Sequence, residues 1–232
     1  VPSIRILGSR VHMVELPGVV NVMAHWIEAE RGTCHHVVNS GMHGIMEAHR
    51  DPEFKAILGR ADLWAPDGIL VVLLARLRGF RLRKHNTGPG LMWEFGRVAD
   101  NKGYKYFVYG DTEETLQLLA EKLTGAFPGL KIVGLHSPPF RSLTPEEDES
   151  IIANINQAEP DVLWVGLGMP KQERWIFEHR DRLNVPVAVG AGASFKFLSG
   201  TAKRAPAWAS NWGLEWLWRL AREPGRVWRR VF

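Results

Sequence analysis

An aspartate directly after a short apolar run is the residue of this sequence best placed for acid–base chemistry. The run 63–65 ends at Pro66, Asp67 and Gly68 follow, and the apolar segment Ile69–Leu77 comes next. This order predicts a strand, a tight turn and a helix, with the carboxylate at the carboxyl end of the strand. Ligands bind at that edge of open α/β sheets, where a carboxylate can accept a proton from a hydroxyl. The alternative is that Asp67 caps the helix, a common use of Asp before a helix.

Small or polar residues also follow the other strands that the sequence predicts. Glycine lets a ligand approach the backbone closely, and a helix N-terminus directs amide groups toward anions. The turns therefore favour a phosphate-bearing ligand, although turns between strands and helices favour Gly and Asn in any case. The turns are Asn39-Ser40-Gly41, Gly110-Asp111, Gly166 with Gly168, and Gly190 with Gly192.

The segment after Gly168 reads Met169-Pro170-Lys171-Gln172-Glu173. Lys171 could pair with a phosphate, and Gln172 could hydrogen-bond to a sugar or a phosphate. A solvated first helical turn is an equally good interpretation, because polar first turns are common. The third glycine of the dinucleotide fingerprint is missing, because Lys171 stands in its place, and no P-loop motif occurs, so neither site is supported.

Metal-ion and nucleophilic chemistry find little support in the sequence. His35, His36 and His43 lie close together, but they have none of the ligand spacings of zinc sites. No Asp-x-Asp pair is present to hold a metal ion on a nucleotide diphosphate. We therefore expect no metal ion and no cofactor, with helix ends and cationic side chains meeting the charge of a diphosphate. Cys34 is the single cysteine, so no internal disulfide can form, and it suits a strand position better than a nucleophile.

These residues require a framework in which strands and helices alternate. The pattern repeats at least five times along the 232 residues, which predicts an α/β fold with a parallel sheet and helices on both faces. A small hairpin is expected within residues 4–16, ended by Pro17-Gly18. The expected strands span residues 35–39, 63–65, 104–109, 130–134, 162–165 and 185–189. The expected helices span residues 19–30, 41–49, 54–60, 69–77, 91–101, 112–126 and 170–183, and a further helix is expected to begin at residue 144.

The last thirty residues differ in composition from the rest. Between Lys203 and Phe232 lie seven basic and two acidic residues, so this stretch accounts for the net charge of +4, and half of the ten tryptophans lie there. We therefore divide the chain into a domain of residues 1–202 and a helical C-terminal appendage of residues 203–232. Such a segment can pack as core, bind nucleic acid through phosphate contacts, or lie on an anionic membrane surface. No apolar run is long enough to span a membrane by itself.

Several motifs together resemble one family of bacterial enzymes. The most specific are the run from Gly166 to Glu173 and the run Glu215-Trp216-Leu217-Trp218-Arg219-Leu220. The others are Asn39-Ser40, Asp62 to Gly68, Phe127 to Leu130, Pro160 to Val165, Arg204-Ala205-Pro206 and Glu223-Pro224 with Arg226. Over nearly its whole length the chain resembles the WecG/TagA/CpsF glycosyltransferases, glycosyltransferase family 26.

This resemblance implies a Rossmann-like fold and an inverting, metal-independent transfer. The donor would be a UDP-sugar, often of N-acetylmannosamine, and the acceptor a sugar linked to a polyprenyl diphosphate in cell-surface polysaccharide synthesis. The enzyme would lie in the cytoplasm, peripherally on the inner face of the membrane through its appendage. Asp67 would be the general base, Asn39 and Gln172 site residues, and Arg219 and Arg226 contacts of the diphosphate.

The sequence departs from the family at one motif. His85 and Gly90 stand where the family usually has Arg and Asp. Histidine can still donate to a phosphate or a sugar, but it carries charge only when protonated. A hexosyl or an N-acetylhexosaminyl donor is therefore expected, without a choice between them.

From these observations we predict that Asp67 is catalytic. The predicted substrate-binding residues are Asn39, Ser40, His85, Gly110, Asp111, Gly166, Gly168, Lys171, Gln172, Arg219 and Arg226. The transferase would bind an anionic membrane surface rather than nucleic acid, and it could form a homo-oligomer. The alternatives are a nucleic-acid-binding α/β module that uses the basic appendage and, less well supported, a nucleotide-sugar epimerase or dehydrogenase.

Overall fold

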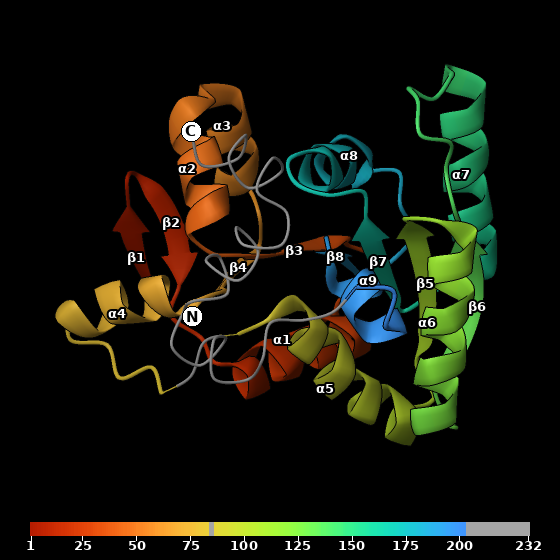
Figure 1. Cartoon of the computed structure of the whole chain (residues 1–232), viewed down its shortest axis with the longest axis horizontal. Coiled ribbons are helices and arrows are strands. Elements are labelled where there is room, and N and C mark those ends of the chain that lie inside the picture. Colours follow the sequence, from red (N-terminus) through yellow and green to blue (C-terminus); the bar gives the residue numbers. More distant parts are fainter. Residues whose placement is uncertain (84–85, 203–232) are drawn as a thin grey trace.

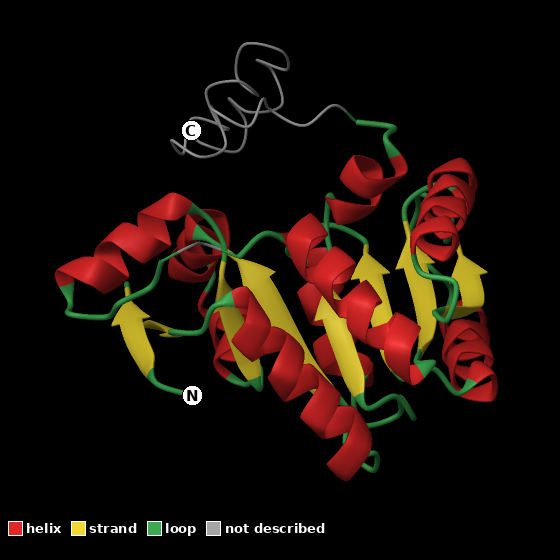
Figure 2. Cartoon of the chain, turned by 90° about the horizontal axis from the view of Figure 1, so that it is seen from below, coloured by secondary structure: helices red, strands yellow, loops and turns green. Residues whose placement is uncertain are grey.

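A computed structural model describes residues 1–83 and 86–202 of the chain. Its centre is a sheet of six parallel strands in the order β4-β3-β8-β7-β5-β6. All six arrowheads therefore point to one edge of the sheet (Figure 2). The predicted parallel sheet is confirmed. The strands are β3 (His35–Ser40), β4 (Leu63–Pro66), β5 (Lys105–Gly110), β6 (Lys131–His136), β7 (Val162–Gly166) and β8 (Val187–Gly190).

Helices cover both faces of this sheet (Figure 1). One face packs against α1, α5, α6 and α9, and the other against α2, α3, α7 and α8. The helix α4 lies at the periphery, beside an N-terminal hairpin. The helices are α1 (Leu16–Ala29), α2 (Met42–Arg50), α3 (Pro52–Gly59), α4 (Ile69–Leu77), α5 (Gly88–Lys102), α6 (Glu113–Ala126), α7 (Pro145–Ala158), α8 (Lys171–His179) and α9 (Ser194–Ser199).

The strand sequences are apolar because both sheet faces are covered. In β7 every residue is buried. Val162 and Trp164 face the core beneath α1 and α5, while Leu163 and Val165 face the core beneath α7 and α8. Successive side chains of a strand point to opposite faces, so one short run of residues stabilises both layers.

The predicted hairpin is confirmed as β1 (Ser3–Ile6) paired antiparallel with β2 (Ser9–His12). It lies against the outermost strand, β4, and the backbone N–H of Trp64 donates to Nδ1 of His12 at 2.9 Å. This bond satisfies a donor that β4 would otherwise leave unpaired at the sheet edge.

Some predicted boundaries are wrong. Pro17 and Gly18 do not break the chain but belong to the first turn of α1, where Pro is tolerated. The helix α5 starts at Gly88, three residues early, because Thr87 caps it. The helix α8 ends at His179, and the sequence pattern did not predict α9.

No helix in the described parts of the chain is long and apolar enough to cross a membrane. The predicted appendage, residues 203–232, lies outside the described residues, and so does His85.

Candidate functional site

A pocket of about 430 Å³ opens at the carboxyl edge of the sheet, over β3, β4, β7 and β8. Five segments far apart in the sequence line it. They are the turns after β3, β4, β7 and β8 and the start of α5, with Phe197 of α9 at the side. This is the edge at which the sequence predicted a ligand site.

Asp67 lines this pocket at the carboxyl end of β4, as predicted. Its backbone N–H donates to the carbonyl of Ser40 at 3.3 Å, which ties the β4 turn to the β3 turn. The N-cap residue of α4 is Gly68, at φ +85°, so Asp67 precedes the cap. The turns approach so closely that a Cβ on Gly41 would lie 2.0 Å from the carbonyl oxygen of Asp67. Glycine at position 41 therefore lets the carboxylate sit beside the end of β3.

Asn39 and Ser40 end β3 and both line the pocket. Oδ1 of Asn39 is buried and accepts no hydrogen bond within the described structure. The hydroxyl of Ser40 accepts from the N–H of Gly44 at 3.2 Å and lies 3.6 Å from Sδ of Met169. Asn39 therefore has an acceptor to offer to a ligand, whereas Ser40 holds the start of α2 against the β7 turn.

Gln172 joins two glycine turns at the pocket wall. Its Oε1 accepts from the N–H of Gly168 at 3.1 Å and from the N–H of Gly192 at 3.0 Å. Its Nε2 donates to Oε1 of Glu173 at 3.0 Å. One side chain thus fixes the ends of β7 and β8 relative to each other, and both Gln172 and Gly168 line the pocket.

The solvated-turn interpretation of residues 171–173 holds only for Lys171, which is exposed and lies outside the pocket lining. Gln172 and Glu173 are 3% and 0% exposed. Oε2 of Glu173 lies 2.9 Å from Nε2 of His36 on β3, which is also fully buried. A buried carboxylate requires such a partner, so this pair anchors α8 to the sheet behind Gln172. The sequence did not predict the pair of Glu173 and His36, because a Glu in a first helical turn is usually exposed.

Three other predicted residues lie at the same sheet edge but outside the pocket lining. A Cβ on Gly110 would lie 2.6 Å from the carbonyl carbon of Gly166, and one on Gly166 would lie 2.3 Å from the ring of Phe195. Packing between elements therefore accounts for both glycines. The carboxylate of Asp111 accepts from the N–H of Thr112 at 2.8 Å and lies 3.7 Å from Nζ of Lys196 on α9.

Several residues of the pocket were not predicted as site residues, among them Thr87, Gly88 and Ser194. A Cβ on Gly88 would lie 2.3 Å from Oγ of Ser194 and 3.2 Å from Nδ2 of Asn39. Gly88 thus brings the start of α5 against β3 and the β8 loop. The sequence shows Thr87 as a helix cap and Gly88 after it. No local pattern in the sequence indicates that residues 86–88 contact residue 194. His85, Arg219 and Arg226 lie outside the described residues.

Among residues 1–83 and 86–202, no group of three His, Cys, Asp or Glu side chains is placed to hold a metal ion. His43 lines the pocket, and the ring of His35 stacks on Trp26 at 4.2 Å. Cys34 is buried, and burial raises the pKa of its thiol to about 12. A thiol of that kind is a poor nucleophile at neutral pH.

Comparison with known proteins gives the chain its family. The profile of the glycosyl transferase WecG/TagA/CpsF family matches residues 4–232. Three curated relatives are each named N-acetylglucosaminyldiphosphoundecaprenol N-acetyl-beta-D-mannosaminyltransferase. The protein of Bacillus subtilis is 32% identical over 89% of this chain and 78% of its own length. The protein of Bacillus spizizenii is 35% identical over 80% of this chain and 70% of its own length. The protein of Staphylococcus aureus is 29% identical over 75% of this chain and 65% of its own length. The chain therefore belongs to the WecG/TagA/CpsF family of glycosyltransferases.

Proposed function

We propose that this glycosyltransferase moves a hexosyl or N-acetylhexosaminyl group from a UDP-sugar to a sugar carried on a polyprenyl diphosphate. The three relatives are named for transfer onto such an acceptor. The observation that carries the proposal is one pocket, at the carboxyl edge of a parallel sheet, that contains both Asp67 and the unpartnered Oδ1 of Asn39. His85 and Gly90 replace the residues usual in the family, so the proposal leaves the donor sugar open.

Asp67 acts as the general base in this proposal. Its carboxylate accepts the proton of the acceptor hydroxyl, the oxygen attacks the anomeric carbon of the donor, and UDP leaves from the opposite side. One displacement of this kind inverts the anomeric configuration. The base must lie within about 3 Å of the hydroxyl in the bound state, and Asp67 at the pocket wall can meet that requirement.

The remaining pocket residues bind and orient the substrates. Asn39 accepts a hydrogen bond from a substrate hydroxyl or amide through Oδ1. Gln172 acts indirectly, because its own oxygen already accepts from two backbone amides, and it holds the turns of Gly168 and Gly192 in place.

The charge of the departing diphosphate needs cationic or dipolar partners. We assign it to Arg219 and Arg226 of the appendage, and we propose that no metal ion is required. The appendage would also hold the enzyme on the inner face of the cell membrane, where a lipid-linked acceptor lies. Its basic residues and tryptophans suit an anionic lipid surface.

A transfer assay tests the proposal. A panel of UDP-sugars would be incubated with a polyprenyl-diphosphate-linked N-acetylglucosamine acceptor, with and without a chelator of divalent cations. We expect product from one donor, unchanged by the chelator and with inverted configuration at the anomeric carbon. Absence of product with every donor, or binding of plain DNA in place of UDP, would contradict the proposal.

A further inference from the structure

The helix α4 exposes leucines on the side that faces away from the protein. Leu70, Leu73, Leu74 and Leu77 are 55%, 44%, 36% and 84% exposed, and their spacing places them on one helical face. The opposite face, with Val71, Val72 and Ala75, is buried in the core beside the hairpin. A helix that is apolar all round is normally covered on all sides, so a partner for the leucine face is missing.

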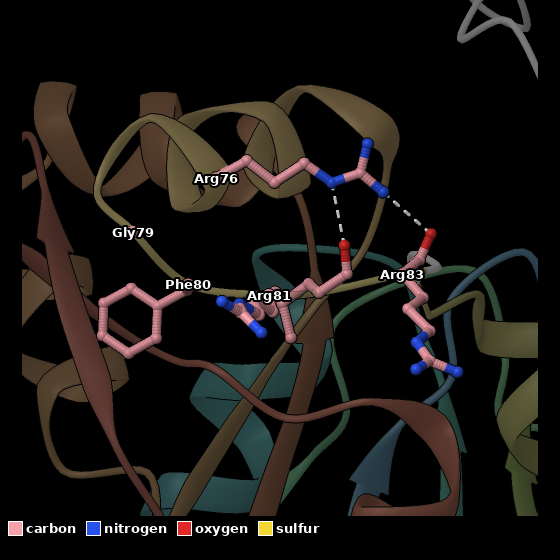
Figure 3. A pocket seen from close by; sticks show the side chains of 6 residues that line it. Arg76, Gly79, Phe80, Arg81 and Arg83 are labelled. Atoms are coloured by element: carbon pink, nitrogen blue, oxygen red, sulfur yellow. Dashed lines mark hydrogen bonds between the residues drawn. The ribbon is translucent and has the colours of Figure 1, made fainter.

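Arginines lie on α4 and on the loop that follows it. Arg76, Arg78, Arg81 and Arg83 are all exposed, and the sequence from Gly68 to Trp93 contains no acidic residue. Arg76 folds over the following loop and donates to the carbonyls of Leu82 and Arg83 at 2.8 and 3.0 Å (Figure 3). Arg78 donates to the carbonyl of Arg5 at 2.8 Å. The side chains of Arg76 and Arg78 thus donate to backbone carbonyls, which leave the positive charge of both groups in place. At the end of the loop the carboxylate of Glu15 accepts the backbone N–H of Arg83.

We propose that α4 and the loop 78–83 form a second contact with an anionic lipid surface, separate from the appendage. We call this set of four leucines and four arginines the α4 surface. Leucines would enter the acyl boundary and arginines would meet the phosphates, as in helices that lie in a membrane interface. The choice of a bilayer as the partner rests on the lipid-linked acceptor of the proposed function.

The charges argue against two other partners. A second copy bound through the same surface would bring arginines against arginines, because symmetric dimers pair a patch with itself. The C-terminal segment 203–232 has seven basic and two acidic residues, so its net charge does not complement that of the arginines. Nucleic acid could pair with the arginines, but it would leave the leucine face in water.

The position of α4 links this surface to the pocket. The helix begins two residues after Asp67, and Gly68 lines the pocket. At 1.5 Å per residue, Leu77 lies about 12 Å from Ile69 along the helix axis. A bilayer on the α4 surface would therefore lie close to the pocket mouth, where a lipid-linked acceptor has to enter.

A position-specific probe tests this contact directly. In the full chain, Cys34→Ala removes the native thiol, and a single cysteine at Leu73 or Leu77 carries an environment-sensitive fluorophore. The matched control is Leu118→Cys on α6, an exposed leucine on another helix. With vesicles of mixed phosphatidylglycerol and phosphatidylcholine we expect a blue shift at positions 73 and 77 and none at 118. If bound protein shows no shift at 73 and 77, or if the protein does not bind the vesicles, the inference is wrong.

Removing charge tests the arginines. Arg81→Gln with Arg83→Gln should weaken vesicle binding about 30-fold, because each basic residue near an anionic surface strengthens binding about fivefold. The control is Arg50→Gln with Lys122→Gln, two exposed cations on α2 and α6, which should change binding less than about twofold. If the two double variants lose vesicle affinity equally, the α4 surface is not the lipid contact. Binding of a DNA duplex in place of vesicles would also contradict the proposal.

A transfer assay separates this inference from the proposed function. Leu73→Gln with Leu77→Gln should retain the rate with a water-soluble, short-chain acceptor. With a long-chain acceptor in vesicles the same variant should be slower by on the order of tenfold, because two leucines no longer enter the lipid. If the variant and the unmodified chain have equal rates with the long-chain acceptor, the membrane contact is wrong, but the proposed function is not affected. If the unmodified chain transfers no sugar to either acceptor, the proposed function is wrong. The fluorescence experiment then still decides whether the α4 surface contacts lipid.

Discussion

At the wall of the pocket, Asn39 carries a buried oxygen that accepts no hydrogen bond from any described residue. Such an atom costs about 1–3 kcal/mol of folding free energy, and native proteins contain few of them. Other buried polar atoms also lack a partner among the described residues, such as the hydroxyl of Tyr106 and Nε1 of Trp164. These two belong to the core cluster beneath α1 and α5. The position of Asn39 in a pocket, beside a carboxylate, is what relates its unpaired oxygen to a ligand.

We therefore predict opposite effects of Asn39→Ala on stability and on binding. Removing an unpaired buried carbonyl removes its desolvation cost, so the free energy of unfolding should stay the same or rise. A lost substrate hydrogen bond should weaken binding of the donor or the acceptor roughly tenfold. Chemical unfolding and calorimetric titration would measure both.

Asn86 provides the control for Asn39→Ala. It is buried and outside the pocket lining. Its Oδ1, like that of Asn39, has no partner among the described residues, but its Nδ2 donates to the carbonyl of Val14 at 2.9 Å, a bond that alanine would remove. Asn86→Ala should therefore lower stability. If Asn39→Ala lowers stability as much as Asn86→Ala and leaves binding unchanged, Asn39 has only a structural role.

Asp67→Asn should lower turnover by roughly 10²–10⁴ while UDP affinity stays nearly unchanged. The amide keeps the shape of the side chain but cannot accept the proton. Steady-state kinetics and UDP titration would separate the two quantities. Asp181→Asn, at an exposed aspartate outside the pocket lining, should change neither. Turnover retained in Asp67→Asn would remove this residue from the role of base.

At the scale of elements, the turn between β7 and α8 depends on one side chain. In Gln172→Leu the N–H groups of Gly168 and Gly192 lose their acceptor, and Glu173 loses a donor. Each buried group without a partner costs about 1–3 kcal/mol, so we predict a loss of at least about 2 kcal/mol in the free energy of unfolding, together with reduced transfer.

The exposed neighbour Lys171 gives the comparison for that experiment. Lys171→Ala should change stability by less than about 0.5 kcal/mol, as expected for a surface position. Urea unfolding of both variants is the measurement. A Gln172→Leu protein as stable as the Lys171→Ala protein would show that the glycine turns are held in some other way.

Local patterns in the sequence were sufficient for most elements and for the edge where the pocket lies. The apolar runs and the glycine turns act over a few residues, and so does the segment Thr144-Pro145-Glu146-Glu147, which forms a capping box at the start of α7. Long-range contacts were beyond such reasoning. The burial of Glu173 depends on His36, 137 positions away, and the pocket wall depends on Gly88 meeting Ser194. The six-residue helix α9 is too short for a periodic pattern to reveal it.

At the scale of the whole molecule, the N-terminal hairpin and the strand that leads to Asp67 form one unit. His12 ends β2 and accepts the N–H of Trp64 in the middle of β4. Trp64 also donates its indole N–H to the carbonyl of Ser40 at 2.9 Å. The hairpin therefore supports the two strands whose ends carry Asn39 and Asp67, so a change at His12 should affect both stability and the pocket.

Burial lowers the pKa of His12 below its ordinary value of 6.5, and the nearby Arg10 and the N-terminus lower it further. The unfolded chain therefore takes up a proton near pH 6.5 that the folded protein does not. Stability should be full above that pH and decline as the pH falls below it, by at most about 1.4 kcal/mol per pH unit for one proton. Thermal unfolding from pH 8 to pH 5 would measure this dependence.

In His12→Asn the side-chain oxygen can still accept the N–H of Trp64 but does not titrate, so the decline should be shallower. Burial also lowers the pKa of His136, so a part of the decline in stability should remain in His12→Asn and become smaller when His136→Asn is added. If His12→Asn has the same pH profile as the unmodified chain, the acid sensitivity of this fold arises elsewhere and His12 is not the group that couples the hairpin to pH.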